Sequence, residues 1–398
     1  MSACSVQSRK NKMLKDEVIE IETTLFTACN LKCSFCFENI NGVRGIDIDY
    51  IKSLPDKVEK VCTPMLKNRP DCHRFRHMMW GGELFYDTIP DSMFGLYDWL
   101  MDEIEARIHK VRPDVRYETL FTSNGVWTKR DRVWKLMQKH HSGISFSYDP
   151  IERFSTPAQK ETWYQTYRYF NERLPMVTVT LAMSKRNMEA YMAGDEYLEK
   201  IQKYAILDPN LYEVGEDWET DDNCPSNEDY FRFFKWCLDT EHYSLIDGGH
   251  NLNLSLPERG KRTDFNIACV PLRFAKWIEE TYGRLCIPAC METSPHLPKK
   301  ALDGGIHYLI DKDVPIDLCA LVLRAGVDRG CYACEYFNRC ELMPCPAMER
   351  DRTVANCFNR RFYQYAESHQ KKLEGFKRWH KELLKRLEEK RERLRSRS

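Results

Sequence analysis

The sequence lacks several features that would place it in a large class of proteins. No apolar run reaches about eighteen residues, so no membrane-spanning helix is expected. The polar segment 1–16 has no apolar core of the kind found in secretory signals, which predicts a protein of the reducing cytoplasm. An excess of charge is also missing, because 60 Lys and Arg balance 60 Asp and Glu. Net charge therefore indicates neither a nucleic-acid partner nor an acidic one.

Cysteine, by contrast, is abundant, with 17 in 398 residues. In a reducing compartment so many thiols do not form a disulfide framework, and they indicate bound metal instead. Three of them, at positions 29, 33 and 36, have the spacing C-x3-C-x2-C, and nine more fall between Cys269 and Cys357. The chain is thus expected to hold metal in two separate cysteine fields.

Strand-like runs alternate with helical patterns in the first half of the chain. Helical patterns cover 89–108 and 130–140, and β-rich or apolar runs cover 17–27, 75–80, 117–121, 143–148 and 176–183. This alternation predicts an α/β fold with a parallel sheet, in the form of a partial or complete βα barrel. In such a barrel the functional loops follow the carboxyl ends of the strands. The first cysteine field follows the first strand and therefore lies at that edge.

Cys29, Cys33 and Cys36 supply three thiolates, one fewer than a closed [4Fe–4S] cluster requires. The fourth iron would then have no protein ligand and would be open to a small molecule. The alternative is a zinc knuckle, which normally has a second pair of cysteines nearby. No such pair follows here.

Together with Phe35, these three cysteines resemble the signature of the radical S-adenosylmethionine (SAM) superfamily. The resemblance implies a (β/α)6-type partial barrel and a [4Fe–4S] cluster whose open iron chelates the amino and carboxylate groups of SAM. It further implies reductive cleavage of SAM to a 5′-deoxyadenosyl radical, which abstracts a hydrogen atom from the substrate. The cofactor performs this chemistry, and the protein positions it and excludes water.

The next strand ends carry residues that the resemblance assigns to SAM. Gly81, Gly82 and Glu83 resemble the GGE motif, in which the glycines let the backbone approach the methionine part of SAM and the glutamate accepts from its ammonium. Asn124, in an S-N-G end, and Ser147, in an S-Y-D end, resemble further polar contacts of SAM. For each of these motifs an ordinary turn or strand end is the alternative.

The second cysteine field resembles the SPASM extension found in peptide- and protein-modifying members of the superfamily. The resemblance assigns one auxiliary cluster to Cys331, Cys334, Cys340 and Cys357. It assigns the other to Cys345 and Cys269, joined by two of Cys286, Cys290 and Cys319.

The second cysteine field differs from the SPASM pattern in several positions. The last spacing is four residues instead of three, Cys319 is additional, and the fourth ligand of the second group stays open. Met291 stands where sulfatase-maturing members have an acid, so their dehydrogenation is not carried over. Structural zinc is an alternative for 331–345.

These features predict a polar extension over 1–16, a radical SAM core over 17–190, and the end of the barrel with a linker over 191–265. A SPASM-like auxiliary iron–sulfur domain would cover 266–360, and a basic amphipathic helix 361–398. Between 371 and 398 the tail has twelve Lys or Arg and five Glu, with apolar residues near heptad spacing. It would pack on its own domain or bind a phosphate backbone, a leader peptide or a partner helix.

The predicted function is that of a radical SAM enzyme of oxidoreductase or isomerase type. It would abstract hydrogen from an amino-acid-like carbon of a peptide, protein or aminoacyl group. The expected cofactors are SAM, its [4Fe–4S] cluster and one or two auxiliary [4Fe–4S] clusters, with flavodoxin or ferredoxin as reductant. One alternative is modification of a nucleic-acid base, or of an amino-acid adduct on a base, with the tail as contact. The other is a binding module that holds a cluster or zinc.

Overall fold

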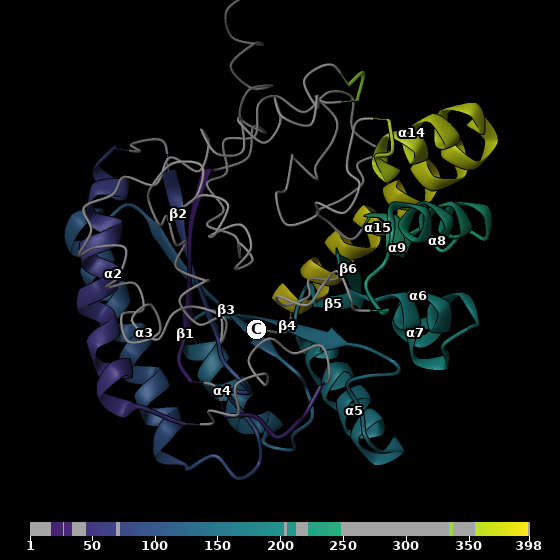
Figure 1. Cartoon of the computed structure of the whole chain (residues 1–398). Coiled ribbons are helices and arrows are strands. Elements are labelled where there is room, and N and C mark those ends of the chain that lie inside the picture. Colours follow the sequence, from purple (N-terminus) through teal and green to yellow (C-terminus); the bar gives the residue numbers. More distant parts are fainter. Residues whose placement is uncertain are drawn as a thin grey trace, which may run out of the picture.

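The computed structural model describes residues 17–26, 28–33, 45–68, 72–202, 205–211, 222–247, 334–336 and 355–396. Its centre is one six-stranded sheet in which all neighbouring strands are parallel and follow one another in chain order (Figure 1). The strands are β1 (Glu17–Thr24), β2 (Cys72–Trp80), β3 (Arg116–Ser123), β4 (Gly143–Tyr148), β5 (Thr178–Met183) and β6 (Ile206–Leu211). The predicted α/β barrel architecture is confirmed.

Helices connect the strands, as parallel pairing requires. Those of the barrel are α2 (Ile48–Asn68), α3 (Ser92–Val111), α4 (Arg130–Lys139), α5 (Pro157–Arg173), α6 (Lys185–Met192) and α7 (Glu196–Ile201). After β6 come α8 (Asn227–Asp239), α9 (Ser244–Asp247), α14 (Phe358–Ser368) and α15 (Gln370–Arg395). None of the described helices is long and apolar enough to cross a membrane.

The two faces of the sheet differ in character. On β3 every second side chain is buried, and Phe121 packs edge-on against Phe85, with ring centroids 5.2 Å apart. On the alternate face Glu118 accepts from Arg74 at 2.6 Å and from Arg76 at 2.9 Å. Strand β3 thus has one buried face that joins the core and one face with a charged group.

The C-terminal segment differs from the single helix predicted over 361–398. Its first helix begins at Phe358, and the backbone leaves the helical region at His369, which separates α14 from α15. Leu373, Phe376 and Leu383 are buried, so the heptad face of α15 packs on its own chain.

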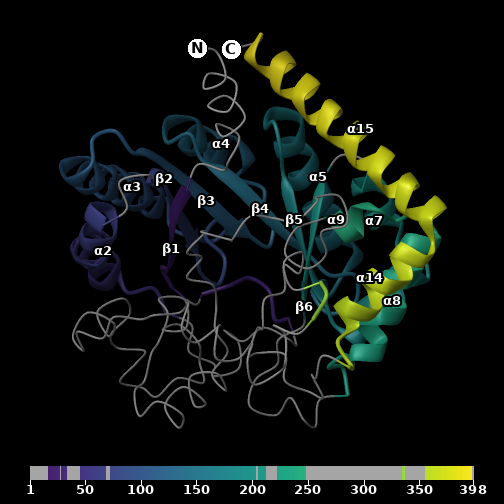
Figure 2. The same ribbon diagram turned by 90° about the horizontal axis from the view of Figure 1, so that it is seen from above.

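The far end of α15 is placed by a contact with α5, where Lys390 Nζ donates to Asn171 Oδ1 at 2.9 Å. Helix α5 runs back from the carboxyl end of β4 toward the amino end of β5, and Asn171 lies in its last turn. The basic end of α15 is therefore near the amino edge of the sheet, opposite the strand ends that carry the motifs. Figure 2 shows α15 passing along the side of the molecule.

Candidate functional site

The segment after β1 is joined by its backbone to the segment after β2. Leu25 N donates to Trp80 O at 2.9 Å, Gly82 N to Phe26 O at 2.8 Å, and Glu83 N to the oxygen of Ala28 at 2.9 Å. These bonds continue the β1–β2 pairing beyond the ends of the strands. They hold the first cysteine segment beside the Gly-Gly-Glu motif.

Gly81 has a reason to be glycine within the protein itself. A Cβ atom at this position would lie 2.6 Å from the Phe26 carbonyl oxygen, closer than any side-chain carbon is tolerated. The missing side chain therefore lets the cysteine segment approach β2. The predicted role of Gly81 and Gly82 in admitting SAM stays a prediction.

Glu83 is a buried carboxylate held by neutral donors, with 1% of its surface exposed. It accepts from Phe85 N at 3.1 Å, from Ser123 Oγ at 3.0 Å and from Asn124 N at 2.6 Å. Burial raises the pKa of Glu83 to about 7, although these hydrogen bonds lower it. No cation of the described chain lies within ion-pair distance of it, so a cationic ligand would be stabilised here.

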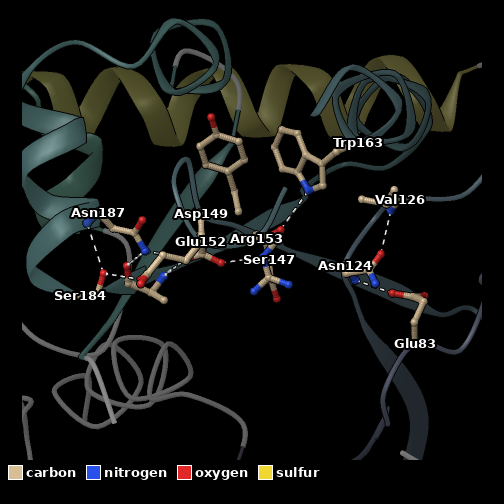
Figure 3. A network of polar contacts seen from close by, with 12 residues as sticks. Glu83, Asn124, Val126, Ser147, Asp149, Glu152, Arg153, Trp163, Ser184 and Asn187 are labelled. Carbon is tan, nitrogen blue, oxygen red and sulfur yellow. Dashed lines mark hydrogen bonds and ion pairs between the residues drawn. The ribbon is translucent and has the colours of Figure 1, made fainter. Parts of the chain in front are cut away.

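Asn124 is buried at the end of β3 and faces the cysteine segment. Its Nδ2 lies 2.8 Å from Asn30 Oδ1 and 3.6 Å from Cys29 Sγ. Its Oδ1 accepts from Val126 N at 2.8 Å (Figure 3). The structure thus brings Asn124 to the first cysteine. Its assignment as a SAM contact stays a prediction.

Ser147 lies at the end of β4, where its carbonyl accepts from Trp163 Nε1 at 3.0 Å. Its half-buried hydroxyl makes no hydrogen bond to another described residue. That hydroxyl is therefore available for a ligand, and its assignment to SAM also stays a prediction.

Asp149, two residues further on, is fully buried and engaged within the protein. It accepts from Arg153 Nε at 2.6 Å, from Ala182 N at 2.9 Å and from Asn187 Nδ2 at 3.3 Å. Burial raises its pKa, while the charge of Arg153 lowers it. Asp149 thus joins the ends of β4 and β5 (Figure 3).

Arg153 is the residue at this site that sequence reasoning missed. Only 12% of its side chain is exposed, and its charge lowers the pKa of both Glu83 and Cys33, although burial raises each of these pKa values overall. The guanidinium therefore acts electrostatically on both halves of the site. The sequence pattern does not predict this pair, because a turn over 150–153 brings the Arg153 side chain back to Asp149.

The predicted metal-binding cysteines are only partly described. Cys29 is half-buried and Cys33 is buried, while Cys36 lies outside the described residues. Of the second field, Cys334 and Cys357 are described and half-buried. The remaining predicted ligands lie outside the described residues: Cys269, Cys286, Cys290, Cys319, Cys331, Cys340 and Cys345.

Cys334 and Cys357 lie close enough to interact electrostatically. Burial raises the pKa of Cys334, and the neighbouring Cys357 raises it further. The short segment that carries Cys334 is attached to α14 by two contacts. The ring of Tyr336 stacks on that of Tyr363, with centroids 5.0 Å apart, and Arg360 Nε donates to the Glu335 carboxylate at 3.1 Å. Two of the four ligands predicted for one auxiliary cluster are thus brought to the start of α14.

One other group of potential ligands occurs among the described residues, formed by Asp98, Asp102 and His140. Lys139 Nζ lies 2.7 Å from Asp98 Oδ1 and 2.9 Å from Asp102 Oδ2. An ammonium already neutralises these carboxylates, so we read the group as a structural ion-pair cluster between α3 and α4.

No family model and no curated protein sequence matches the chain. Among solved structures, anSMEcpe with bound AdoMet and Cp18Cys peptide is similar, with a TM-score of 0.52 and 12% identity over 89% of this chain and 98% of that one. The chain has the fold of this structure. The motifs that resemble the radical SAM superfamily thus lie at the carboxyl edge of a barrel of this fold.

SuiB from Streptococcus suis is a weaker structural match. Bound to its precursor peptide SuiA, it matches 60% of this chain with 15% identity and a TM-score of 0.38. Bound to S-adenosylmethionine, it matches 60% with 14% identity and a TM-score of 0.40. The matched part spans about half of SuiB, 49% and 50% of that chain in the two structures.

Proposed function

We propose that this chain is a radical SAM enzyme in which Cys29, Cys33 and Cys36 hold a [4Fe–4S] cluster. The observation that carries the proposal is the convergence of Cys29, Cys33 and a buried, cation-free Glu83 at the carboxyl edge of a radical SAM barrel. Thiolates are the ligands that iron–sulfur clusters require. When bound, the cluster and SAM supply a 5′-deoxyadenosyl radical.

The side chains at this edge match the charged ends of the methionine part of SAM. Glu83 would accept the ammonium, which would supply the positive charge that its buried carboxylate lacks. Arg153, whose charge acts on both Cys33 and Glu83, suits the carboxylate, because a guanidinium donates two parallel hydrogen bonds to such a group. The Ser147 hydroxyl, which makes no hydrogen bond to another described residue, is a further donor. The edge thus offers an acceptor and donors for a zwitterion.

The substrate class we propose is a peptide, a protein or an aminoacyl group, with hydrogen abstracted from an amino-acid-like carbon. Support comes from anSMEcpe, which was solved with a peptide and whose fold this chain matches over 98% of that chain. Oxidation, cross-linking, epimerisation and rearrangement are the possible outcomes of such a step. They correspond to an oxidoreductase or an isomerase.

We further propose that Cys334 and Cys357 hold an auxiliary [4Fe–4S] cluster together with Cys331 and Cys340. The attachment of the Cys334 segment to α14, which begins directly after Cys357, supports this pairing. The remaining ligands, Cys345, Cys269 and two of Cys286, Cys290 and Cys319, would form a second cluster. Flavodoxin or ferredoxin would supply electrons.

Modification of a nucleic-acid base gains no support from the basic helix. Its last turns contact Asn171 at the amino edge of the sheet, whereas Cys29 and Glu83 lie at the carboxyl edge. A nucleic acid bound along the end of α15 would therefore not reach the motifs directly. Salt-dependent retention on DNA that is lost on removing 370–398 would be the observation in its favour.

The test is SAM cleavage by protein purified and reconstituted without oxygen. With dithionite and SAM we expect release of 5′-deoxyadenosine, its abolition in Cys33→Ala, and no loss in Cys62→Ala. Cys62 is a matched control, because it is a buried cysteine of α2 outside the site. Zinc without acid-labile sulfide would establish the binding-module alternative. A loaded cluster that never cleaves SAM would exclude the proposed function.

A further inference from the structure

The backbone of Val126 sets the orientation of two asparagine side chains at the site. Its N–H donates to Asn124 Oδ1 at 2.8 Å, and its carbonyl accepts from Asn30 Nδ2 at 2.6 Å. A backbone N–H only donates and a backbone carbonyl only accepts, so neither amide can be reversed without losing its bond. The orientation of both side chains therefore follows from the main chain.

With the orientations set, the two amides join each other and the first cysteine. Asn124 Nδ2 donates to Asn30 Oδ1 at 2.8 Å, which closes a ring of three hydrogen bonds between the cysteine segment and the end of β3. The same nitrogen, which has two hydrogens, also points to Cys29 Sγ at 3.6 Å. Leu31 N donates to this sulfur at 3.4 Å. Cys29 thus has two N–H groups directed at its sulfur.

The turn that makes this arrangement possible depends on Gly125. Its φ is +71°, and a Cβ atom there would lie 2.8 Å from Trp163 Cδ1. Glycine lets the chain turn back, so that Val126 faces the two asparagines. Asn124 is itself 5% exposed, so its amide is held in the protein and not in solvent.

We propose that Asn124, anchored by Asn30, is a positioning residue that fixes the cysteine segment and donates a hydrogen bond to the Cys29 thiolate when the cluster is bound. This inference rests on the proposed function and adds a role for Asn124 beyond any contact with SAM. Hydrogen bonds to cluster sulfurs stabilise the more negative, reduced form and so raise the reduction potential. Second-shell donors also fix the orientation of a ligand.

The test measures the reduction potential of the SAM-binding cluster in the full chain. Its signal in electron paramagnetic resonance is identified by the change on adding SAM. Asn124→Ala should shift the midpoint potential to more negative values and speed the loss of iron to a chelator. Asn30→Ala, which keeps the donor but loses its anchor, should shift the potential in the same direction by less.

Asn187→Ala is the matched control. Asn187 is a buried amide in the first turn of α6, where it donates to Ala182 O at 3.0 Å and to Asp149 Oδ1 at 3.3 Å. It makes no hydrogen bond to the described part of the cysteine segment. Its truncation should leave the potential unchanged. A potential equal to that of the unaltered protein in a fully loaded Asn124→Ala or Asn30→Ala would overturn the inference.

Failure of both asparagine variants to retain a cluster that Asn187→Ala retains would support the positioning role. An unaltered protein that binds no cluster is a different result, which would remove the proposed function itself.

Discussion

The two halves of the barrel mouth each bury a carboxylate, but they hold it by different means. On the β2–β3 side Glu83 accepts from two backbone N–H groups and the Ser123 hydroxyl, all of them neutral. On the β4–β5 side Asp149 has a guanidinium, that of Arg153, at 2.6 Å. Both carboxylates are almost completely buried, with 1% and 0% of their surface exposed.

The two carboxylates therefore differ in whether the protein itself supplies a cation, which Asp149 contacts and Glu83 does not. A buried carboxylate with a cation in contact is already neutralised, and removing either partner is costly. A buried carboxylate with only neutral donors keeps an uncompensated charge and gains from an arriving cation. The comparison therefore supports the proposed binding of a cation at Glu83, whereas Asp149 and its partners join the ends of β4 and β5.

The largest effect on stability is expected from removing the cation that contacts Asp149 on the β4–β5 side. Arg153→Leu leaves Asp149 buried without its cation and should lower the free energy of unfolding by about 3–5 kcal/mol. Urea unfolding of the cluster-free protein measures this. Combining Arg153→Leu with Asp149→Asn should restore most of the loss, because no unpaired charge remains. If the single variant were as stable as the unaltered protein, the two halves would not differ as described.

On the β2–β3 side, the raised pKa of Glu83 should make the free energy of unfolding depend on pH. Because the pKa of Glu83 is raised from 4.5 to about 7, its stabilising contribution is complete below pH 4.5 and is lost as the pH rises through about 7. The corresponding decline in the free energy of unfolding is about 3 kcal/mol. It should disappear in Glu83→Gln, measured by urea unfolding of cluster-free protein from pH 4 to 8.

Glu118→Gln provides a control of opposite sign for the Glu83 measurement. Burial raises the pKa of Glu118, but Arg74 and Arg76 more than offset this and lower it. Glu118 therefore contributes stability above its unfolded pKa and loses it as the pH falls. Equal pH profiles for the unaltered protein and Glu83→Gln would contradict our description of the β2–β3 side.

A smaller effect on stability is expected at Gly81, where close backbone packing holds the cysteine segment against the end of β2. Gly81→Ala places a Cβ atom against the Phe26 carbonyl and should destabilise the protein by about 1–3 kcal/mol, with reduced iron incorporation. Gly95→Ala, within α3 and with nothing within 4 Å of the added carbon, should instead stabilise it by up to about 1 kcal/mol. Thermal unfolding and iron analysis of both variants provide the comparison. Similar behaviour of the two glycines would show that the cysteine segment is not held in this way.

The strands that carry the motifs were predictable, because their signals are local. The run 143–148 coincides with β4, and the run 117–121 lies within β3. Strand β6 was not predicted as a strand, since its sequence I-L-D-P-N-L contains a proline. Proline is tolerated only at the edge of a sheet or at a bulge, and β6 is an edge strand. Its position in the sheet, which the sequence pattern does not show, explains the miss.

Contacts between distant residues account for what the sequence left open. The ring of Asn30, Asn124 and Val126 joins positions 94 and 96 residues apart. Heptad spacing predicted an amphipathic tail helix, but its packing against α5 and Tyr243 could not be read from that spacing. Only the tertiary structure therefore shows that the tail helix packs on its own chain.

Residue spacing alone was enough to predict strands β1 to β5, the cysteine motif after β1 and the polar residues at the strand ends, because such patterns depend on near neighbours. The roles of Glu83, Asp149 and Arg153 were decided only by folding. Burial and the identity of each hydrogen-bond partner set the energy of a charge, and both arise when segments far apart in the chain meet.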